Sequence, residues 1–476
     1  MPGPLPRPTG AGTGAGEKQL VLSEKPERVK GGVMTAALAA GLLLAACAPF
    51  GPAIRSRATP APASPSGGSR FLPLLPTVQF VAAVSAAPAP AAVSAPLPLT
   101  LTMWTTEVFS PLQDDQGGRI MRQQVDEFLA QDPHVGVDFK LKKAYGIGGV
   151  ADFLRTTGAV VPQSLPDLAI VDMAELPDVA RAGLVRPLSG LVSPKLQADL
   201  FPFAVKGGTV DGQLVGLIFE AEVLHLAYNK KLTAPPVTWA DVLSGTAQYV
   251  FANGGQEMEQ ANDSFWLQYL ADGGTLTLTP DAEQPVLDPG ALEAVFGFYQ
   301  EGANRGAILK AVLDYKTDGD SWAAFLSGKA ALANVSSLRF LSSRALLSDT
   351  GFAPAPTHDG QPATIASGWA LVIVAKDPAR QEAAARLSEW LLAPERSSAW
   401  TRATNRLPAT RQALARWDQS DEYTSFVRGL LEVAQPTPGG LQFDAVSKTI
   451  ERAIRDVIAG GVSPKEAAAQ VAGAGG

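Results

Sequence analysis

Hydrophobic and polar residues alternate where the pattern of a folded domain begins. Leu99, Leu101 and Met103 are separated by threonines, and this period of two predicts a β-strand over residues 98–105. In the next segment the apolar residues recur at helical spacing, which predicts a helix over residues 117–131 that stops at an Asp-Pro pair. The chain therefore opens with a strand followed by a helix.

Three further segments continue this alternation. Residues 135–141 have the pattern of a strand, residues 149–159 that of a helix, and residues 166–172 that of a buried strand. Such an order is typical of an α/β sheet with crossover connections. Ligands of these sheets bind beyond the carboxyl ends of the strands, so the first candidate residues are Thr105, Thr106, Glu107 and Asp172.

Capping residues mark the starts of later helices. Thr238 is followed three residues later by Asp241, which is the spacing of a capping box. Asp288 and Asp377 each precede a proline, a pair that favours the first turn of a helix. We interpret these residues as structural.

Composition narrows the class of protein. With 18% charged and 46% hydrophobic residues, the 476-residue chain is globular and long enough for two sizeable lobes. The net charge of -7 gives no reason to expect a nucleic-acid partner. No second apolar run of about 20 residues follows Cys47, which argues against a membrane-spanning body. Because Cys47 is the only cysteine, no internal disulfide can form.

The first 47 residues have the layout of a secretory signal. Basic residues between positions 25 and 30 precede a short apolar stretch, residues 34–46, which is followed by Cys47. Residues 44–47, Leu-Ala-Ala-Cys, resemble the lipobox of bacterial lipoproteins, in which the cysteine is acylated and becomes the first residue. Stable anchoring takes more than one acyl chain. We therefore predict a signal peptide over residues 1–47 with lipidation at Cys47. Met34 is an alternative translation start, although translation from Met34 would remove the basic residues.

A tether is predicted between this cysteine and the folded body. Residues 48–98 are rich in Pro, Ala and Ser and contain few charges. Such a composition cannot bury enough surface to offset the entropy of ordering, and proline keeps it extended. A tether of this kind would hold the folded body clear of the membrane.

Several phrases carry a family resemblance because they occur in a fixed order. The strongest passage, residues 211–243, contains an Asp-Gly hairpin, a strand that ends in Tyr228-Asn229, and a Thr-Trp helix start. It lies between "PDLAIVDMAELPDVARAGLVRPLSGLV" and the later phrases "FLSGKAALANVSS" and "SGWALVIV", with a closing "LPATR" turn. Together these phrases resemble the extracellular solute-binding proteins of the sugar-binding type, maltose-binding-protein-like components of ABC importers. The resemblance covers nearly everything from about residue 99 to the C-terminus.

Two departures lie near the expected cleft. Where the family usually has a proline soon after the hairpin, this chain has "LIFEAE", and a frequent aromatic position falls in "NVSSLRF". An atypical ligand is therefore an open alternative.

The resemblance implies an α/β, two-lobed periplasmic-binding-protein type II fold, each lobe a mixed sheet flanked by helices, with a hinge of two or three crossings. It places residues 99–221 and 352–402 in the N-terminal lobe and residues 222–351 and 403–476 in the C-terminal lobe. The implied partners are a small solute, permease subunits of an ABC transporter, and the extracytoplasmic membrane surface through the N-terminal lipid. We expect a monomer with no cofactor, no metal and no catalytic residues.

The same resemblance selects candidate ligand-binding residues. Glu222 falls where sugar binders often place a carboxylate that accepts from hydroxyl groups, and charged acceptors make the stronger hydrogen bonds. Trp104 offers an aromatic face to a sugar. For each candidate the alternative is burial or simple solvation, and Arg406 is expected at the surface. The full candidate set is Trp104, Thr105, Glu107, Asp172, Glu222, Asn334, Ser367 and Trp369.

Alternative functions stay open at this point. The three histidines lack suitable partner motifs, and neither a GxSxG nor an HExxH motif occurs, but a glycosidase needs only two carboxylates. A lipoprotein sensor of the same fold is not distinguished by any motif. A sugar is the preferred solute, although clustered carboxylates would equally suit a cationic amine. An iron carrier usually needs paired tyrosines, of which the chain has few.

Overall fold

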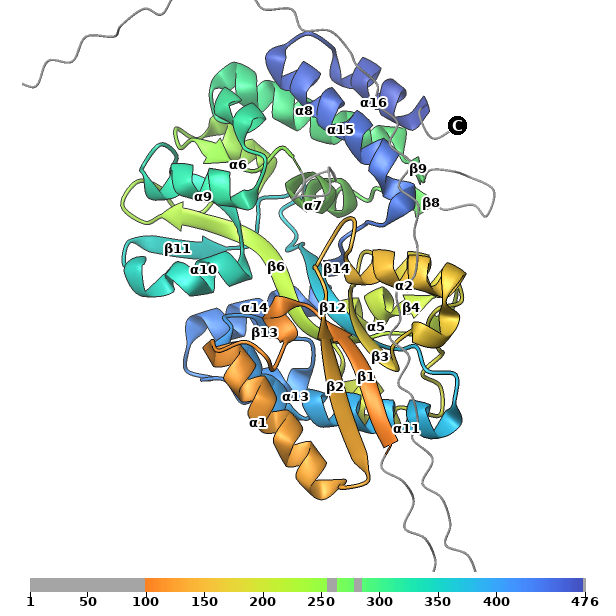
Figure 1. Cartoon of the computed structure of the whole chain (residues 1–476). Coiled ribbons are helices and arrows are strands. Elements are labelled where there is room, and N and C mark those ends of the chain that lie inside the picture. The colour runs from red at the N-terminus through yellow and green to blue at the C-terminus, as the bar shows by residue number, and fades with distance from the viewer. Residues whose placement is uncertain (1–98, 255–262, 278–284, 474–476) are drawn as a thin grey trace, which may run out of the picture. The chain divides into compact units, whose positions relative to one another are not determined.

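A mixed β-sheet organises the part of the chain that the structure describes, residues 99–254, 263–277 and 285–473 of a computed structural model (Figure 1). These residues belong to one compact unit. The main strands, in spatial order, are β2 (Val135–Leu141), β1 (Leu99–Thr105), β3 (Leu168–Asp172), β12 (Ile365–Ile373), β6 (Leu217–Asn229), β10 (Leu332–Ser336) and β7 (Tyr249–Val250). Three short strands join them: β11 (Thr350–Ala353) and β13 (Leu407–Pro408) on β6, and β14 (Gln435–Pro436) on β12.

The first five predicted elements are confirmed. β1 pairs in parallel with both β2 and β3, and the helices α1 (Gln116–Gln131) and α2 (Val150–Val160) provide the crossovers. All three parallel strands therefore present their carboxyl ends at the same edge of the sheet.

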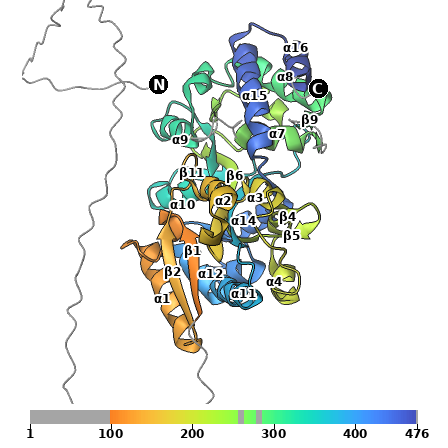
Figure 2. The same ribbon diagram turned by 45° about the vertical axis from the view of Figure 1, so that its right-hand side comes forward.

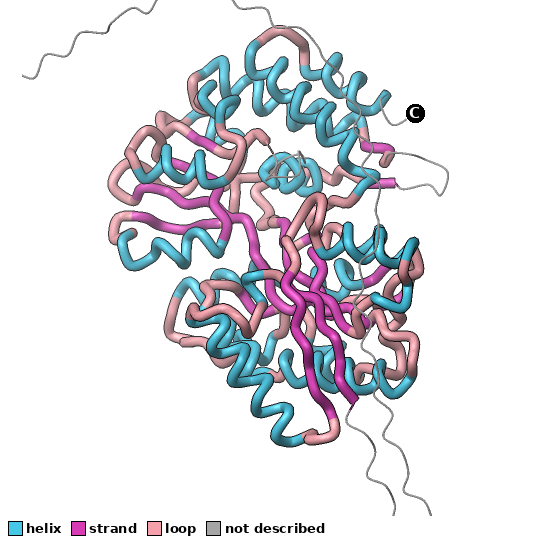
Figure 3. The backbone as a smooth tube through the Cα atoms, in the orientation of Figure 1, coloured by secondary structure: helices cyan, strands magenta, loops and turns pink. Residues whose placement is uncertain are grey.

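The long strand β6 links the two ends of the sheet. Its first half pairs antiparallel with β12 and β13, and its second half pairs antiparallel with β10 and β11. Figure 3 shows the strands running through the centre of the fold, with helices around both ends.

The helices fall into two groups, one around each end of β6, and the groups adjoin where α14 (Glu422–Val433) packs against α10 (Ser337–Ser343) (Figures 1 and 2). Around β1, β3 and the start of β6 lie α1, α2, α3 (Leu176–Arg181), α4 (Pro194–Asp199), α5 (Pro202–Gly208), α11 (Pro378–Leu392), α12 (Pro394–Ala403), α13 (Arg411–Leu414) and α14. Around the end of β6 and β10 lie α6 (Trp239–Ser244), α7 (Asp263–Ala271), α8 (Pro289–Arg305), α9 (Asp318–Leu326), α10, α15 (Leu441–Ala459) and α16 (Pro464–Gly473). Short 3-10 helices occur at η1 (Glu107–Phe109), η2 (Pro162–Ser164), η3 (Lys310–Asp314) and η4 (Arg344–Leu346).

Local turn and cap chemistry also follows the sequence. Asp211 and Gly212 have φ values of 48° and 77° and connect β4 (Thr209–Val210) to β5 (Gln213–Leu214) as a tight hairpin. Thr238 forms the predicted capping box, and Asp288 and Asp377 cap α8 and α11. A second hairpin pairs β8 (Leu276–Thr277) with β9 (Val286–Leu287).

The predicted signal peptide, Cys47 and the tether lie outside the described residues. Within the described ranges, no helix combines the length and the apolar character needed to cross a membrane.

A buried histidine anchors the packing around the middle of β6. His225 is 0% exposed, and its ring contacts Phe340, Tyr423 and Phe426 edge-on. Nδ1 lies 3.1 Å from the carbonyl oxygen of Leu226, which can only accept, so Nδ1 carries the proton. Nε2 lies 3.0 Å from the hydroxyl of Tyr423 and accepts from it. Burial lowers the pKa of His225 to about 4.

This histidine makes stability depend on pH. The pKa of His225 in the folded state lies below its ordinary value of about 6.5. The contribution of the neutral imidazole to the free energy of unfolding is therefore complete above about pH 6.5 and is lost as the pH falls through about 4. His225→Gln keeps an acceptor for Tyr423 but does not titrate. We expect the advantage of the wild type over this variant, measured by urea unfolding, to shrink by up to about 3 kcal/mol between pH 7 and pH 4. Parallel pH profiles for the two proteins would contradict this assignment.

Candidate functional site

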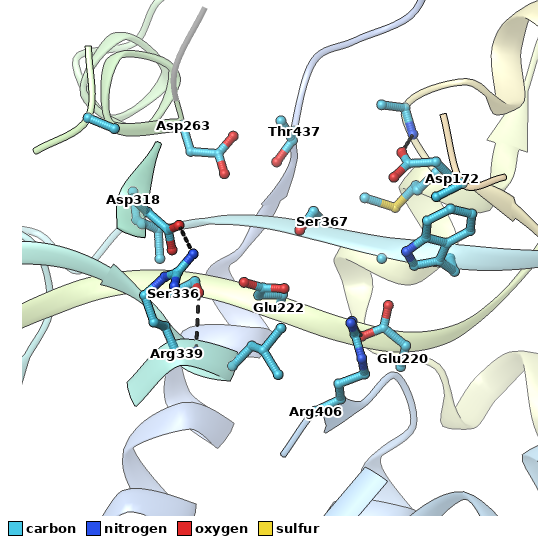
Figure 4. A pocket seen from close by; sticks show the side chains of 18 of the residues that line it. Asp172, Glu220, Glu222, Asp263, Asp318, Ser336, Arg339, Ser367, Arg406 and Thr437 are labelled. Atoms are coloured by element: carbon cyan, nitrogen blue, oxygen red, sulfur yellow. Dashed lines mark hydrogen bonds and ion pairs between the residues drawn. The ribbon is translucent and has the colours of Figure 1, made fainter. Parts of the chain in front are cut away.

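A cavity of about 710 Å³ lies where β3, β12, β6 and β10 come together (Figure 4). Helices α7, α9 and α10 contribute side chains from one group, and the segments after β2 and β3 contribute from the other. This volume falls within the range of small-molecule sites. Its charged lining consists of Asp172, Glu175, Glu220, Glu222, Asp263, Asp318, Arg339 and Arg406.

The register of the sheet places three of the lining residues in one row. Trp369 on β12 pairs with Asp172 on β3 and with Glu220 on β6. Two residues before Trp369, Ser367 pairs with Glu222, so a second polar pair points to the same face. The pleat of the sheet therefore gathers these side chains, although they are far apart in the sequence.

Trp369 is held firmly in this row. It is 7% exposed, and its ring packs against Tyr145 and Phe109 with centroid distances of 5.4 and 5.5 Å. The preceding residue must be glycine, because a Cβ at Gly368 would collide with the carbonyl oxygen of Glu220. A bulge between Trp369 and Ala370 follows directly. The indole is thus a fixed part of the wall.

Asp172, at the end of β3, is fixed by two hydrogen bonds. Its Oδ1 accepts from the backbone N–H of Ala174 at 2.7 Å, and its Oδ2 accepts from the hydroxyl of Tyr145 at 2.9 Å. Burial raises the pKa of Asp172 more strongly than these bonds lower it. Tyr145, which follows β2, has a raised pKa through burial and through the neighbouring Asp172 charge.

Glu220 and Arg406 form a buried ion pair beside this row. Nη1 of Arg406 donates to Oε2 of Glu220 at 3.2 Å, and the exposed fractions of the two side chains are 13% and 1%. Burial raises the pKa of Glu220 to about 7 against the opposing effect of Arg406. The expectation that Arg406 lies at the surface is wrong, because β13 pairs with β6 and carries this arginine inward.

The other end of the cavity holds a second ion pair. Nη2 of Arg339 donates to Oδ1 of Asp318 at 2.7 Å (Figure 4). Glu222 lies between Arg339 and Arg406 in this view, and burial raises its pKa. Asp263, at the start of α7, has a pKa raised to about 7 by burial and by the charges of Glu222 and Asp318.

Glu175 completes the acidic lining beyond β3. Burial raises its pKa to about 8, with a further contribution from Asp172. In the described part of the chain, no group of three or more His, Cys, Asp or Glu side chains is arranged to hold a metal ion.

The sequence model of the bacterial extracellular solute-binding protein family matches residues 123–426, which is more than half of the chain. The chain belongs to the bacterial extracellular solute-binding protein family. The resemblance found in the sequence is thereby confirmed, and so is the fold class. The members of this family, and the proteins of similar fold, are binding proteins.

One curated relative and two solved structures illustrate how similar this chain is to known proteins. The maltotriose-binding protein of Pyrococcus abyssi is 25% identical over 217 residues, which span 44% of this chain and less than half, 45%, of the relative. The cyclic α-maltosyl-1,6-maltose-binding protein of Arthrobacter globiformis aligns with a TM-score of 0.62 at 20% identity, over 79% of this chain and 98% of its own. The sugar-binding protein MalE of Xanthomonas citri aligns with a TM-score of 0.61 at 21% identity, over 79% and 95%.

Five of the eight candidate residues line the cavity of this solute-binding protein. They are Asp172, Glu222, Asn334, Ser367 and Trp369. The amide of Asn334 is engaged in packing, because its Oδ1 accepts from Tyr249 and its Nδ2 donates to Ser264. Contact between these five residues and the solute stays a prediction.

The remaining three candidates lie outside the lining. Trp104 is buried against Phe153, with the Lys142 ammonium 4.7 Å from its ring centre. Thr105 is fully buried, and Glu107 is exposed on η1. Their neighbour Thr106 lines the cavity instead.

Several lining residues were missed by the sequence reasoning. Tyr145 follows β2, a strand parallel to β1, so the rule that ligands bind beyond the carboxyl ends of parallel strands points to it as well. Glu220 stands two residues before Glu222 and therefore shares its face of the strand. Arg339 and Asp318 carry no local signal, because only the packing of α9 and α10 brings them together.

Removing Arg406 should test the buried pair. Arg406→Gln leaves Glu220 buried without its cation, and we expect a loss of about 3 kcal/mol in the free energy of unfolding at pH 8. Lowering the pH to 5 protonates Glu220 and should recover part of the loss. The matched control is Arg402→Gln on the exposed side of α12, which should change stability by less than about 0.5 kcal/mol. Equal stabilities of the two variants in urea unfolding would contradict the account of the pair.

Proposed function

We propose that this protein is a lipid-anchored extracytoplasmic solute-binding protein that captures a small sugar and delivers it to the permease of an ABC importer. The observation that carries the proposal is the cavity of about 710 Å³, lined by carboxylates and by Trp369 and Tyr145, in a chain of this family. Carboxylate oxygens accept strong hydrogen bonds from hydroxyl groups, and aromatic faces pack against sugar rings. Two similar proteins, a maltotriose-binding protein and a cyclic α-maltosyl-1,6-maltose-binding protein, support the same class of solute.

The solute would act by stabilising a closed arrangement of two lobes. The cavity draws side chains from both helix groups, so a solute in it contacts both. A solute that touches both lobes only when they are closed favours the closed state by its differential affinity. The lobe boundaries predicted from the sequence remain a proposal. α14 packs against α5 of the first group and, through Tyr423 and Phe426, against Phe340 of α10 and Phe352 of β11 in the second, so it lies between the two groups.

A thermal-shift screen with sugars and polyols tests the proposal. A sugar present at about 100 times its dissociation constant adds roughly 2.7 kcal/mol to stability and raises the melting temperature. The sugar should be recovered uncleaved after incubation with the purified protein. A melting temperature that no sugar or polyol changes would contradict the proposed class of solute.

Two glutamate variants test whether the sugar binds in the cavity or on the exposed surface. Glu222→Gln replaces one carboxylate oxygen of a half-buried cavity residue by an NH2 group and removes its charge, and we expect the affinity for the best sugar in the screen to fall by at least about tenfold. Glu107→Gln changes an exposed glutamate outside the cavity and should leave the affinity within about twofold. Isothermal titration calorimetry measures both. An equal loss of affinity in both variants would contradict the proposal that the sugar binds in the cavity.

Lipid anchoring has a test of its own. We expect the mature protein to begin at Cys47, to carry acyl chains detectable by mass spectrometry, and to sediment with membranes. Cys47→Ser should shift the protein to the soluble fraction, because more than one acyl chain is needed for stable attachment. A wild-type protein without lipid in the soluble fraction would contradict this part of the proposal.

A further inference from the structure

The cavity has more carboxyl groups than its own cations can balance. Six carboxyl side chains line it, against two guanidinium groups. Arg406 pairs with Glu220 and Arg339 pairs with Asp318. Among the described residues, the other four carboxyl groups form no ion pair with a lysine or an arginine; they are Asp172, Glu175, Glu222 and Asp263.

Asp172 lines the cavity in the same row of the sheet as Trp369 and Glu220, and its charge acts on other carboxyl groups of the lining. After burial itself, the charge of Asp172 is among the causes that raise the pKa of Glu175, Glu220 and Asp263. The groups that feel this charge come from three different elements, α7, β6 and the turn before α3. A cation beside Asp172 would relieve repulsion toward all of them at once.

Unused hydrogen-bonding atoms provide an independent sign of a ligand. Glu220 is 0% exposed and lines the cavity, yet within the described residues its Oε1 has no hydrogen-bond partner. The hydroxyl of Thr106, 2% exposed and also in the lining, is likewise unpartnered there. Leaving a buried acceptor unpaired is costly, whereas a ligand that donates hydrogen bonds would satisfy it.

We propose that the solute carries an ammonium group that binds beside Asp172, so that the captured sugar is an amino sugar. This inference rests on the proposed function, since it names the kind of sugar for the same cavity. An ammonium group has three donors and no acceptor, which matches a wall of carboxylate oxygens. The neutral hydroxyl groups of the same ring would meet Thr106, Ser367 and the face of Trp369.

Matched pairs of sugars test the charge directly. Titration calorimetry at pH 7.5 and low salt would compare glucose with glucosamine, galactose with galactosamine, and cellobiose with the β-1,4-linked disaccharide of glucosamine. Each pair differs only in replacing hydroxyl groups by amino groups. We expect the amino member of the best-bound pair to bind at least about tenfold tighter, because charge-assisted hydrogen bonds are the stronger ones. Spermidine serves as a cation without sugar hydroxyl groups.

The outcomes separate the two proposals. Neutral sugars that bind as tightly as their amino partners would overturn the ammonium inference and leave the sugar proposal intact. Binding of spermidine without binding of any sugar would overturn the sugar proposal and support the requirement for a positive charge. Failure of every probe to bind would overturn both.

Two isosteric variants locate the charge. Asp172→Asn keeps an acceptor for Ala174 and should reduce the preference for the amino sugar over its neutral partner to within about twofold, whatever the variant's effect on the affinity for neutral sugars. Asp263→Asn, on a different element, should reduce the preference in part. Glu107→Gln is the control and should keep the full preference. Unchanged melting temperatures would show that the variants are folded, and an undiminished preference in folded Asp172→Asn would overturn the placement of the ammonium group.

Discussion

The hydrogen-bonded register of β6 is the constraint on which the site depends. One continuous strand pairs with β12 over its first half and with β10 and β11 over its second, so both ends of the sheet share a single backbone. Because side chains alternate between faces with a period of two, Glu220 and Glu222 point the same way. A slip of one residue in the pairing with β12 would turn both carboxylates away from Trp369 and Ser367. The chemistry of the cavity is therefore a consequence of strand pairing.

The carboxylates that line the cavity can be buried because part of their negative charge is balanced by neighbouring groups. Each of the two arginines pairs with one carboxylate, and backbone and hydroxyl donors hold Asp172 in place. The remaining carboxyl groups are raised in pKa and poorly solvated, which is costly in the free protein. A ligand that supplies donors or positive charge recovers this free energy on binding. The same features that destabilise the empty site would thus give the solute its affinity.

Much of the fold was accessible from sequence because its signals are local. Alternation predicted β1, helical spacing predicted α1, and cap residues marked the starts of α6, α8 and α11. The site was accessible only in part. Asp172 follows the rule for strand ends, but Trp104 and Thr105 turn into the core, and the residue after β1 that faces the cavity is Thr106. Arg406 was misplaced because its burial is set by the pairing of β13 with β6, a contact between distant segments that no local pattern encodes.

A crystal structure of the protein with the tightest-binding sugar tests the central claim most directly. We expect electron density for the sugar between β3, β12 and β6, with its polar groups within hydrogen-bond distance of Asp172 and Glu222 and its ring against Trp369. Density for the sugar at any other surface, with this cavity filled only by water, would contradict the claim that the pairing of these strands builds the binding site.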